Sequence, residues 1–395
     1  MHPPRPRHIL AVIVIAQFAG TSLWFSGNAI LAQLAQALAL DGQPLAAVTS
    51  AVQLGFIAGT LVFALLNIAD RWRPRDVFLA CTLLGAAANA GMLLLPGLEG
   101  RYALLLALRF ATGFFLAGIY PVGMKIAASW WREGLGGALG WLLGALVLGT
   151  ALPHLLAGTL PGTHWQAVVA TVSLLAVGGG LLLHALVGEG PHLAPAPRLR
   201  ITAAARAFAS RDFRASAFGY FGHMWELYTL WAFVPLMLAA YGQRHEQALD
   251  IGFWAFCIIG AGSLGCVGGG MLSRSLGSAR VAFGQLGCSG LCCLLSPLAY
   301  LLPPAGFLAF MLFWGVTVAG DSPQFSALNA ALAPREFVGS ALTIANCIGF
   351  AISVLSLHVA TALAAVLPLP LWFVPIAAGP LLGLLACSRL AARRA

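Results

Sequence analysis

The feature of this sequence that most constrains its fold is a series of apolar runs, each about as long as a membrane-spanning helix. A helix needs roughly 20 apolar residues, at about 1.5 Å of rise per residue, to cross a hydrocarbon layer about 30 Å thick. Twelve such runs occupy residues 9–38, 45–68, 77–96, 102–124, 135–156, 165–187, 215–240, 248–272, 281–302, 305–328, 337–366 and 371–388. They predict an all-α membrane protein with twelve transmembrane helices.

The composition excludes a soluble fold and a nucleic-acid-binding protein. Of 395 residues, 60% are hydrophobic and 8% are charged, whereas soluble domains average about 45–50% and about a quarter. The formal net charge is +9, but the basic residues lie in short gaps between apolar runs, not clustered on one solvated face. The first run is too long for the core of a secretory signal, so we expect it to be retained. The expected partner is the lipid bilayer.

The cysteines suggest no metal site, disulfide or cofactor. They form no CxxC pair and have no interleaved histidines, so we interpret them as small residues of the helix core. All eight lie within or at the ends of apolar runs: Cys81, Cys257, Cys266, Cys288, Cys292, Cys293, Cys347 and Cys387.

The basic residues alternate between the two sides of the predicted membrane. On one side lie 18 of the 21: Arg5, Arg7, Arg71, Arg73, Arg75, Lys125, Arg132, Arg198, Arg200, Arg206, Arg211, Arg214, Arg274, Arg280, Arg335, Arg389, Arg393 and Arg394. Because cytoplasmic loops carry the excess of Lys and Arg, both termini and the central loop are predicted to be cytoplasmic. A bacterial inner membrane fits this pattern.

An internal repeat divides the chain near its middle. Residues 117–121 (Ala-Gly-Ile-Tyr-Pro) recur as 319–323 (Ala-Gly-Asp-Ser-Pro), and the Arg-Glu pair at 132–133 recurs at 335–336. We predict two parallel six-helix bundles. The matched prolines suggest paired kinks.

The domain boundaries follow from this repeat and from the longest polar stretch of the chain. We expect bundles at 1–187 and 214–395 and a cytoplasmic linker at 188–213. The linker is either simply solvated or ends in a short basic amphipathic helix on the inner leaflet.

Two loops and one helix motif resemble the major facilitator superfamily. The family's loop has the form G-x-L-A-D-R-x-G-R-K; residues 66–75 keep Ala69-Asp70-Arg71 and the basic tail without the glycines, and 270–277 keep both glycines without Asp-Arg. Arg109 and Gly113 match the family's fourth-helix pattern. The resemblance covers essentially the whole chain and implies a twelve-helix secondary transporter of bacterial type, working by alternating access.

One motif of the family's antiporters is not met. Gly140, Gly144 and Gly149 form a glycine ladder, but Thr150 stands where the family has proline, and the nearest proline is Pro153. This difference disfavours drug export by proton exchange without excluding it.

Arg109 is a candidate functional residue because a charge at the bilayer centre costs about 2.5–3.5 kcal/mol even on lenient insertion scales. It lies eight residues after Arg101, roughly 12 Å along a helix and near mid-depth. We expect it to face the cavity between the halves. Three roles stay open: attracting an anionic group, balancing a carboxylate that exchanges a proton, or tying helix ends to backbone carbonyl groups.

His223 and Glu226 form a second candidate pair near mid-depth of the seventh span. They are three residues apart and therefore share a helix face, with Tyr220 and Tyr228 beside them. Carboxyl and imidazole groups can both bind and release protons when their surroundings change. The alternative is a Glu-His hydrogen bond that only packs helices.

Asp70, Arg71 and Asp321 are expected to act in gating. Asp321 lies seventeen residues after Pro304, roughly 26 Å along a helix, which predicts a position near the cytoplasmic face. In proteins that the chain resembles, the loop of Asp70 and Arg71 helps lock the halves in one access state. A plain solvated loop is the alternative for this pair.

The first span is more polar than a lipid-facing helix requires, with Trp24 and Asn28 near its middle. These side chains either line a substrate cavity or make hydrogen bonds between helices.

Together these features predict a monomeric secondary transporter that binds a small anionic or zwitterionic organic solute between its halves, coupled to protons as a symporter. The alternative is a proton-driven exporter of drugs or other amphipathic compounds. An enzyme acting on lipids would need a nucleophile with its base or a metal cluster, and the sequence shows neither. A sensor without transport would leave the central charges without a purpose.

Overall fold

The computed structural model describes residues 8–40, 44–131, 135–159, 164–193, 199 and 206–392. Every regular element among these residues is helical. The contacts divide the chain into two compact units, Met1–Arg198 (unit 1) and Leu199–Ala395 (unit 2). The Arg-Glu pair at 132–133 and two parts of the predicted linker, 194–198 and 200–205, lie outside the described residues.

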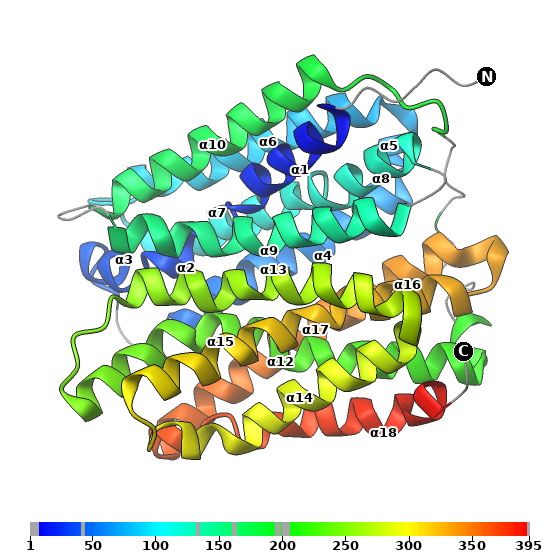
Figure 1. The fold of residues 1–395 in the computed structure, drawn as a ribbon. Coiled ribbons are helices and arrows are strands. Elements are labelled where there is room, and N and C mark those ends of the chain that lie inside the picture. The colour runs from blue at the N-terminus through cyan, green and yellow to red at the C-terminus, as the bar shows by residue number, and fades with distance from the viewer. Residues whose placement is uncertain are drawn as a thin grey trace. The chain divides into compact units, whose positions relative to one another are not determined.

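Unit 1 is a helical bundle in which α4 packs along α7, α6 lies between α7 and α10, and α1 contacts α9 and α10 (Figure 1). Its elements are α1 (His8–Thr21), α2 (Ser26–Ala29), α3 (Leu31–Ala37), α4 (Leu45–Leu65), α5 (Ile68–Arg71), α6 (Pro74–Ala90), η1 (Gly91–Leu94), α7 (Arg101–Leu116), α8 (Tyr120–Trp130), α9 (Leu135–Thr159) and α10 (Trp165–Leu186).

Unit 2 repeats this plan, with α13 packed along α15 and with α12 in contact with α17 and α18. Its elements are α12 (Arg211–His245), α13 (Ile251–Leu276), α14 (Ser278–Ala299), α15 (Pro304–Gly320), α16 (Ser322–Leu332), η2 (Arg335–Phe337), α17 (Val338–Val366), η3 (Leu369–Leu371), η4 (Pro375–Ala377) and α18 (Ala378–Ala392).

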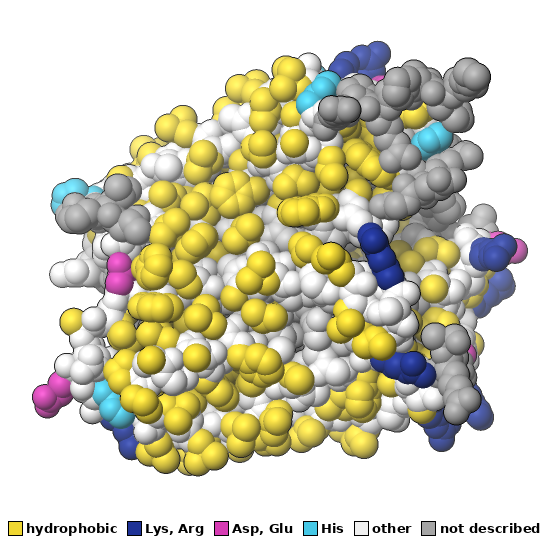
Figure 2. All heavy atoms as spheres, in the orientation of Figure 1, with side chains coloured by type: hydrophobic (Ala, Val, Ile, Leu, Met, Phe, Trp, Pro, Cys, Tyr) yellow, Lys and Arg dark blue, Asp and Glu magenta, His cyan; other side chains and the backbone are white. Residues whose placement is uncertain are grey.

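Ten helical segments in the described residues are long and apolar enough to cross a membrane. Two other segments complete the predicted set of twelve. One is the first apolar run, which is divided among α1, α2 and α3, and the other is α12, a 35-residue helix whose polar side chains lower its hydropathy. Hydrophobic side chains cover much of the length of the helices, while charged side chains lie mainly toward helix ends (Figure 2).

Both copies of the repeated motif interrupt their helices. In unit 1 the helix stops at Leu116 and resumes at Tyr120, and in unit 2 it stops at Gly320 and resumes at Ser322. Each new helix has proline in its first turn, where the missing N–H leaves no hydrogen bond unmade. The sequence thus has a proline next to the interruption at the same place in each unit.

Close helix packing is also repeated. A Cβ atom at Gly113 of α7 would collide with the backbone carbonyl oxygen of Val52 in α4, and one at Gly315 of α15 would collide with that of Ile258 in α13. The two glycines are 202 residues apart, as are residues 117 and 319 of the motif. Small residues at helix contacts let two backbones approach closely inside a membrane.

Replacing Gly113 with Ala is expected to force α4 and α7 apart and to destabilise unit 1 by about 1–3 kcal/mol, the usual cost of overpacking. Thermal unfolding of the purified chain in detergent measures this effect. Gly140→Ala is the matched control, because nothing lies within 4 Å of a Cβ atom built at Gly140. Equal melting temperatures for the two variants would contradict the assignment of Gly113 to helix packing.

Candidate functional site

The candidate site of unit 2 is centred on α12, whose length places His223 and Glu226 well inside the bundle. The helix begins with a capping bond in which the Phe213 backbone N–H donates to the Ser210 side chain, and it continues to His245. His223 and Glu226 are 1% and 0% exposed. Both side chains therefore need polar partners within the protein.

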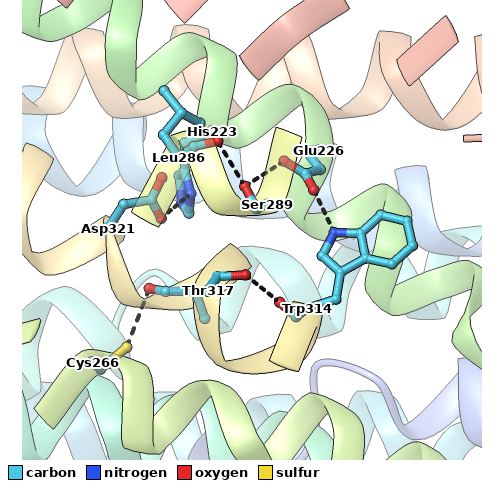
Figure 3. A network of polar contacts seen from close by, with 9 residues as sticks. His223, Glu226, Cys266, Leu286, Ser289, Trp314, Thr317 and Asp321 are labelled. Carbon is cyan, nitrogen blue, oxygen red and sulfur yellow. Dashed lines mark hydrogen bonds and ion pairs between the residues drawn. The ribbon is translucent and has the colours of Figure 1, made fainter. Parts of the chain in front are cut away.

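Glu226 accepts hydrogen bonds from two neighbouring helices (Figure 3). The Ser289 hydroxyl of α14 donates to Oε2 at 2.9 Å. The Trp314 indole N–H of α15 donates to Oε1 at 2.7 Å, and the Cys293 thiol of α14 donates to the same oxygen at 3.3 Å. Ser289 and Cys293 are one helical turn apart and so share a face of α14. The carboxyl group of α12 is thus held by donors on two other helices, α14 and α15.

His223 pairs with Asp321 and not with Glu226. Its Nδ1 lies 2.7 Å from Oδ1 of Asp321, and Asp321 is fully buried. The aspartate follows the last residue of α15, where the helix is interrupted before α16. The interruption thus brings a carboxyl group to the imidazole and keeps both away from water.

Asp321 is fully buried, and its expected depth near the cytoplasmic face is still a prediction. The helical segment that starts at Pro304 continues to Leu332, four residues beyond the predicted end, so Asp321 is followed by a complete helix. Its side chain reaches the same cluster as His223 and Glu226 (Figure 3). A gating role for Asp321 is still a prediction.

The two tyrosines predicted to belong to the site both lie on α12, but they contact different residues. The Tyr220 hydroxyl donates to Asn346 Oδ1 of α17 at 2.8 Å, and its ring centroid is 6.0 Å from that of His223. Tyr228 contacts the rings of Trp231 and Phe350. Tyr220 therefore contacts His223 of the buried cluster, whereas Tyr228, two residues after Glu226, belongs to a separate group of aromatic rings.

Arg109 lies in unit 1, fully buried, where the first span is broken between Thr21 and Ser26. Its guanidinium group donates to the Leu23 carbonyl oxygen at 3.2 Å and to that of Trp24. It also donates to Asn89 Oδ1 at 3.2 Å. Breaking the helix frees carbonyl oxygens that the arginine occupies. This geometry matches the third role foreseen for Arg109, the tying of helix ends.

Trp24 lies within this break, and Asn28 lies just after it on α2. Trp24 is buried, and its ring lies against Phe56 with centroids 4.9 Å apart. The Asn28 amide donates to the Thr49 hydroxyl of α4 at 2.6 Å. Asn28 therefore makes the hydrogen bond between helices that its position allows, and a substrate contact by either residue is still a prediction.

Asp70 and Arg71 end the short helix α5 at the rim of unit 1. Asp70 forms an ion pair with Lys125 of α8, which also donates to the Ala69 carbonyl oxygen at 2.9 Å. Arg71 is exposed. The loop is thus tied to α8 within its own unit, and a role in locking access is still a prediction.

No group of three or more His, Cys, Asp or Glu residues in the described part of the chain is placed to hold a metal ion. The acidic and histidine side chains in the core of unit 2 are of types that can bind and release protons.

Four side chains that bind Arg109 or Glu226 were not predicted from the sequence as their partners: Asn89, Ser289, Cys293 and Trp314. Asn89 carried a usable signal, because an amide inside an otherwise apolar run is costly and needs a partner; its side chain also donates to the Ser173 hydroxyl at 3.0 Å. Ser289, Cys293 and Trp314 are ordinary members of apolar helices. Only the packing of α12, α14 and α15 reveals them.

Comparison with known proteins assigns the family. The model of the Major Facilitator Superfamily matches residues 12–357. A search of curated proteins finds no match. Among solved structures, the human organic anion transporter MFSD10 (TETRAN) is similar, with a TM-score of 0.67 and 17% sequence identity over 97% of this chain and 100% of that chain. At this identity the similarity concerns the fold alone.

The family model spans most of the chain, and the structural match extends over both units. The prediction of an all-α membrane fold of this type is confirmed, and the family consists of transporters, not enzymes. This chain belongs to the major facilitator superfamily and is a multi-pass secondary transporter of small molecules.

Proposed function

We propose that this transporter is a proton-coupled symporter of a small anionic or zwitterionic organic solute, working by alternating access. The observation that carries the proposal is the environment of Glu226, a fully buried carboxyl group with donors on two other helices and the His223–Asp321 pair nearby. Carboxyl groups in such surroundings are typical sites of proton exchange in transporters. Binding or releasing a proton there changes the charge of the whole cluster.

A buried positive charge supports an anionic or zwitterionic solute. The partners of Arg109 among the described residues are two backbone carbonyl groups and one amide, all of them neutral. No carboxylate in the described part of unit 1 is among these partners, so the charge of Arg109 is not balanced there. An unbalanced charge in a medium of low dielectric constant attracts anions strongly. Unit 1 would supply attraction for the solute, and unit 2 would supply the proton-exchanging groups.

The distribution of basic residues supports an orientation with both termini in the cytoplasm of a bacterial inner membrane. On that side lie 18 of the 21 basic residues, as the positive-inside rule requires. We further propose that a single chain is the functional unit, since one chain already contains both six-helix repeats.

The second candidate is a proton-driven exporter of drugs or other amphipathic compounds. The aromatic group of Tyr228, Trp231 and Phe350 favours it, because such rings bind apolar organic compounds. Growth of a drug-sensitive bacterial host with and without the chain separates the two: protection from toxic compounds indicates export, and improved growth on a limiting organic acid or amino acid indicates uptake.

Glu226→Gln is expected to abolish solute transport driven by a pH gradient, lowering it at least about tenfold, because the amide cannot exchange a proton. The measurement uses proteoliposomes with a pH-sensitive dye inside and a panel of small carboxylates and amino acids outside. Glu246→Gln is the matched control: Glu246 follows the last residue of the same helix and is exposed. Proton-coupled uptake that survives Glu226→Gln would refute coupling through this residue.

Two substitutions of Arg109 distinguish the effect of its charge on solute binding from the effect of its hydrogen bonds on stability. Arg109→Lys keeps the charge and loses part of the hydrogen bonding, so we expect a lower melting temperature and a nearly unchanged KM for an anionic solute. Arg109→Gln removes the charge and is expected to raise KM about tenfold, equivalent to about 1.4 kcal/mol. If the folded Lys variant has the same high KM as the Gln variant, the charge of Arg109 does not attract the solute.

A further inference from the structure

The donors around Glu226 act on different oxygens of its carboxyl group. Trp314 and Cys293 both donate to Oε1, at 2.7 Å and 3.3 Å, whereas Ser289 lies 2.9 Å from Oε2. An indole N–H can donate but cannot accept a hydrogen bond. Oε1 must therefore stay an acceptor in every protonation state. A proton bound by Glu226 in this arrangement belongs on Oε2, facing Ser289.

The Ser289 hydroxyl can reverse its role in this contact. Its oxygen lies 2.9 Å from Glu226 Oε2 and 3.2 Å from the Leu286 carbonyl oxygen, one turn earlier on α14 (Figure 3). A hydroxyl has one hydrogen to donate and two lone pairs that accept. When Glu226 is ionised, Ser289 donates to Oε2. When Oε2 carries a proton, Oε2–H donates to Ser289, and the serine hydrogen turns to Leu286.

We propose that Ser289 is a positioning residue that keeps Glu226 fully hydrogen-bonded both with and without its proton. The inference rests on the proposed function of Glu226 as the proton-exchanging group and identifies the atom that binds the proton. Only one proton is gained or lost, at Oε2, and no covalent bond of Ser289 breaks. Buried polar groups left without a partner are costly, so this rotation removes a barrier to proton exchange.

The other donors to Glu226 cannot reverse their hydrogen bonds as Ser289 can. Trp314 has no lone pair in the ring plane to accept a proton, and a thiol such as that of Cys293 is only a weak donor and acceptor. Among the described residues, Cys292 and Cys293 on α14 and Asp321 after α15 interact with Glu226, and His223 on α12, Cys266 on α13 and Cys387 on α18 interact with Asp321. The test must therefore assign the signal of Glu226 itself.

The experiment is a pH titration of the purified full-length chain, followed by infrared difference spectroscopy of the carboxylic C=O band. The part of the band that disappears in Glu226→Gln and persists in Asp321→Asn belongs to Glu226. Hydrogen bonds to an ionised acceptor are about twice as strong as those between neutral groups, so Ser289→Ala should disfavour the ionised form. We expect its midpoint to move toward alkaline pH by about one pH unit.

Cys293→Ala is the matched control, because it removes one heavy atom that contacts the same carboxyl group, one turn along α14, and leaves Trp314 on Oε1. Its midpoint should stay within about 0.3 pH unit of the unchanged chain, since a thiol donates weakly. If Ser289→Ala does not fold, Ser289→Cys retains an atom at the same place with weaker donation and should shift the midpoint in the same direction by less.

Two results would overturn the role of Ser289 alone: an unchanged midpoint in Ser289→Ala, or equal shifts in Ser289→Ala and Cys293→Ala, which would indicate loss of packing. Absence of any titrating band that depends on Glu226 would overturn both this inference and proton coupling through Glu226. An alkaline shift confined to the Ser289 variants supports it.

Discussion

A buried guanidinium group can persist in the apolar core of a helical bundle only where the protein itself supplies acceptors for its N–H groups. Arg109 meets this requirement with backbone atoms. The first span of unit 1 is interrupted, and the carbonyl oxygens of Leu23 and Trp24 turn toward the arginine. Irregular backbone is tolerated at membrane depth only where protein satisfies it. The charge and the break in the helix therefore depend on each other, and the neighbouring contacts of Asn28 and Asn89 are arranged around them.

In unit 2 one of the buried ionisable groups is a carboxyl group, Glu226, and its hydrogen-bond partners are side chains instead of backbone atoms. The unit's counterpart of the first span, α12, is continuous from Arg211 to His245, and Glu226 is held by donors on α14 and α15. The repeat thus preserves packing but not charge. Gly113 and Gly315 make equivalent close contacts, whereas Met311 stands 202 residues after Arg109. Two halves with one architecture have acquired different electrostatics.

The sequence was sufficient to predict elements that depend on one segment at a time, because hydrophobic length and helix-breaking residues are local properties. The apolar runs, the paired interruptions near Pro121 and Pro323, and the buried position of Glu226 belong to this class. The break in the first span left only an indirect trace: the run 9–38 is longer than the roughly 20 residues that a span needs. The partners of His223 and Glu226 could not be predicted, since they depend on how α14 and α15 rotate against α12. No pattern of spacing in the sequence distinguishes Ser289 or Trp314 from the other residues of their helices.

Under the proposed function, protonation of Glu226 would act directly on the packing of the helices around it. Its donors come from α14 and α15, and Asp321, the partner of His223, lies where α15 gives way to α16. A proton added to the cluster weakens the attraction that an ionised carboxylate has for those donors, because charge-assisted hydrogen bonds are the stronger kind. Any movement of α14 or α15 away from α12 must break the same bonds. Protonation would weaken the same hydrogen bonds that helix movement must break. Coupling of the two processes requires such shared contacts.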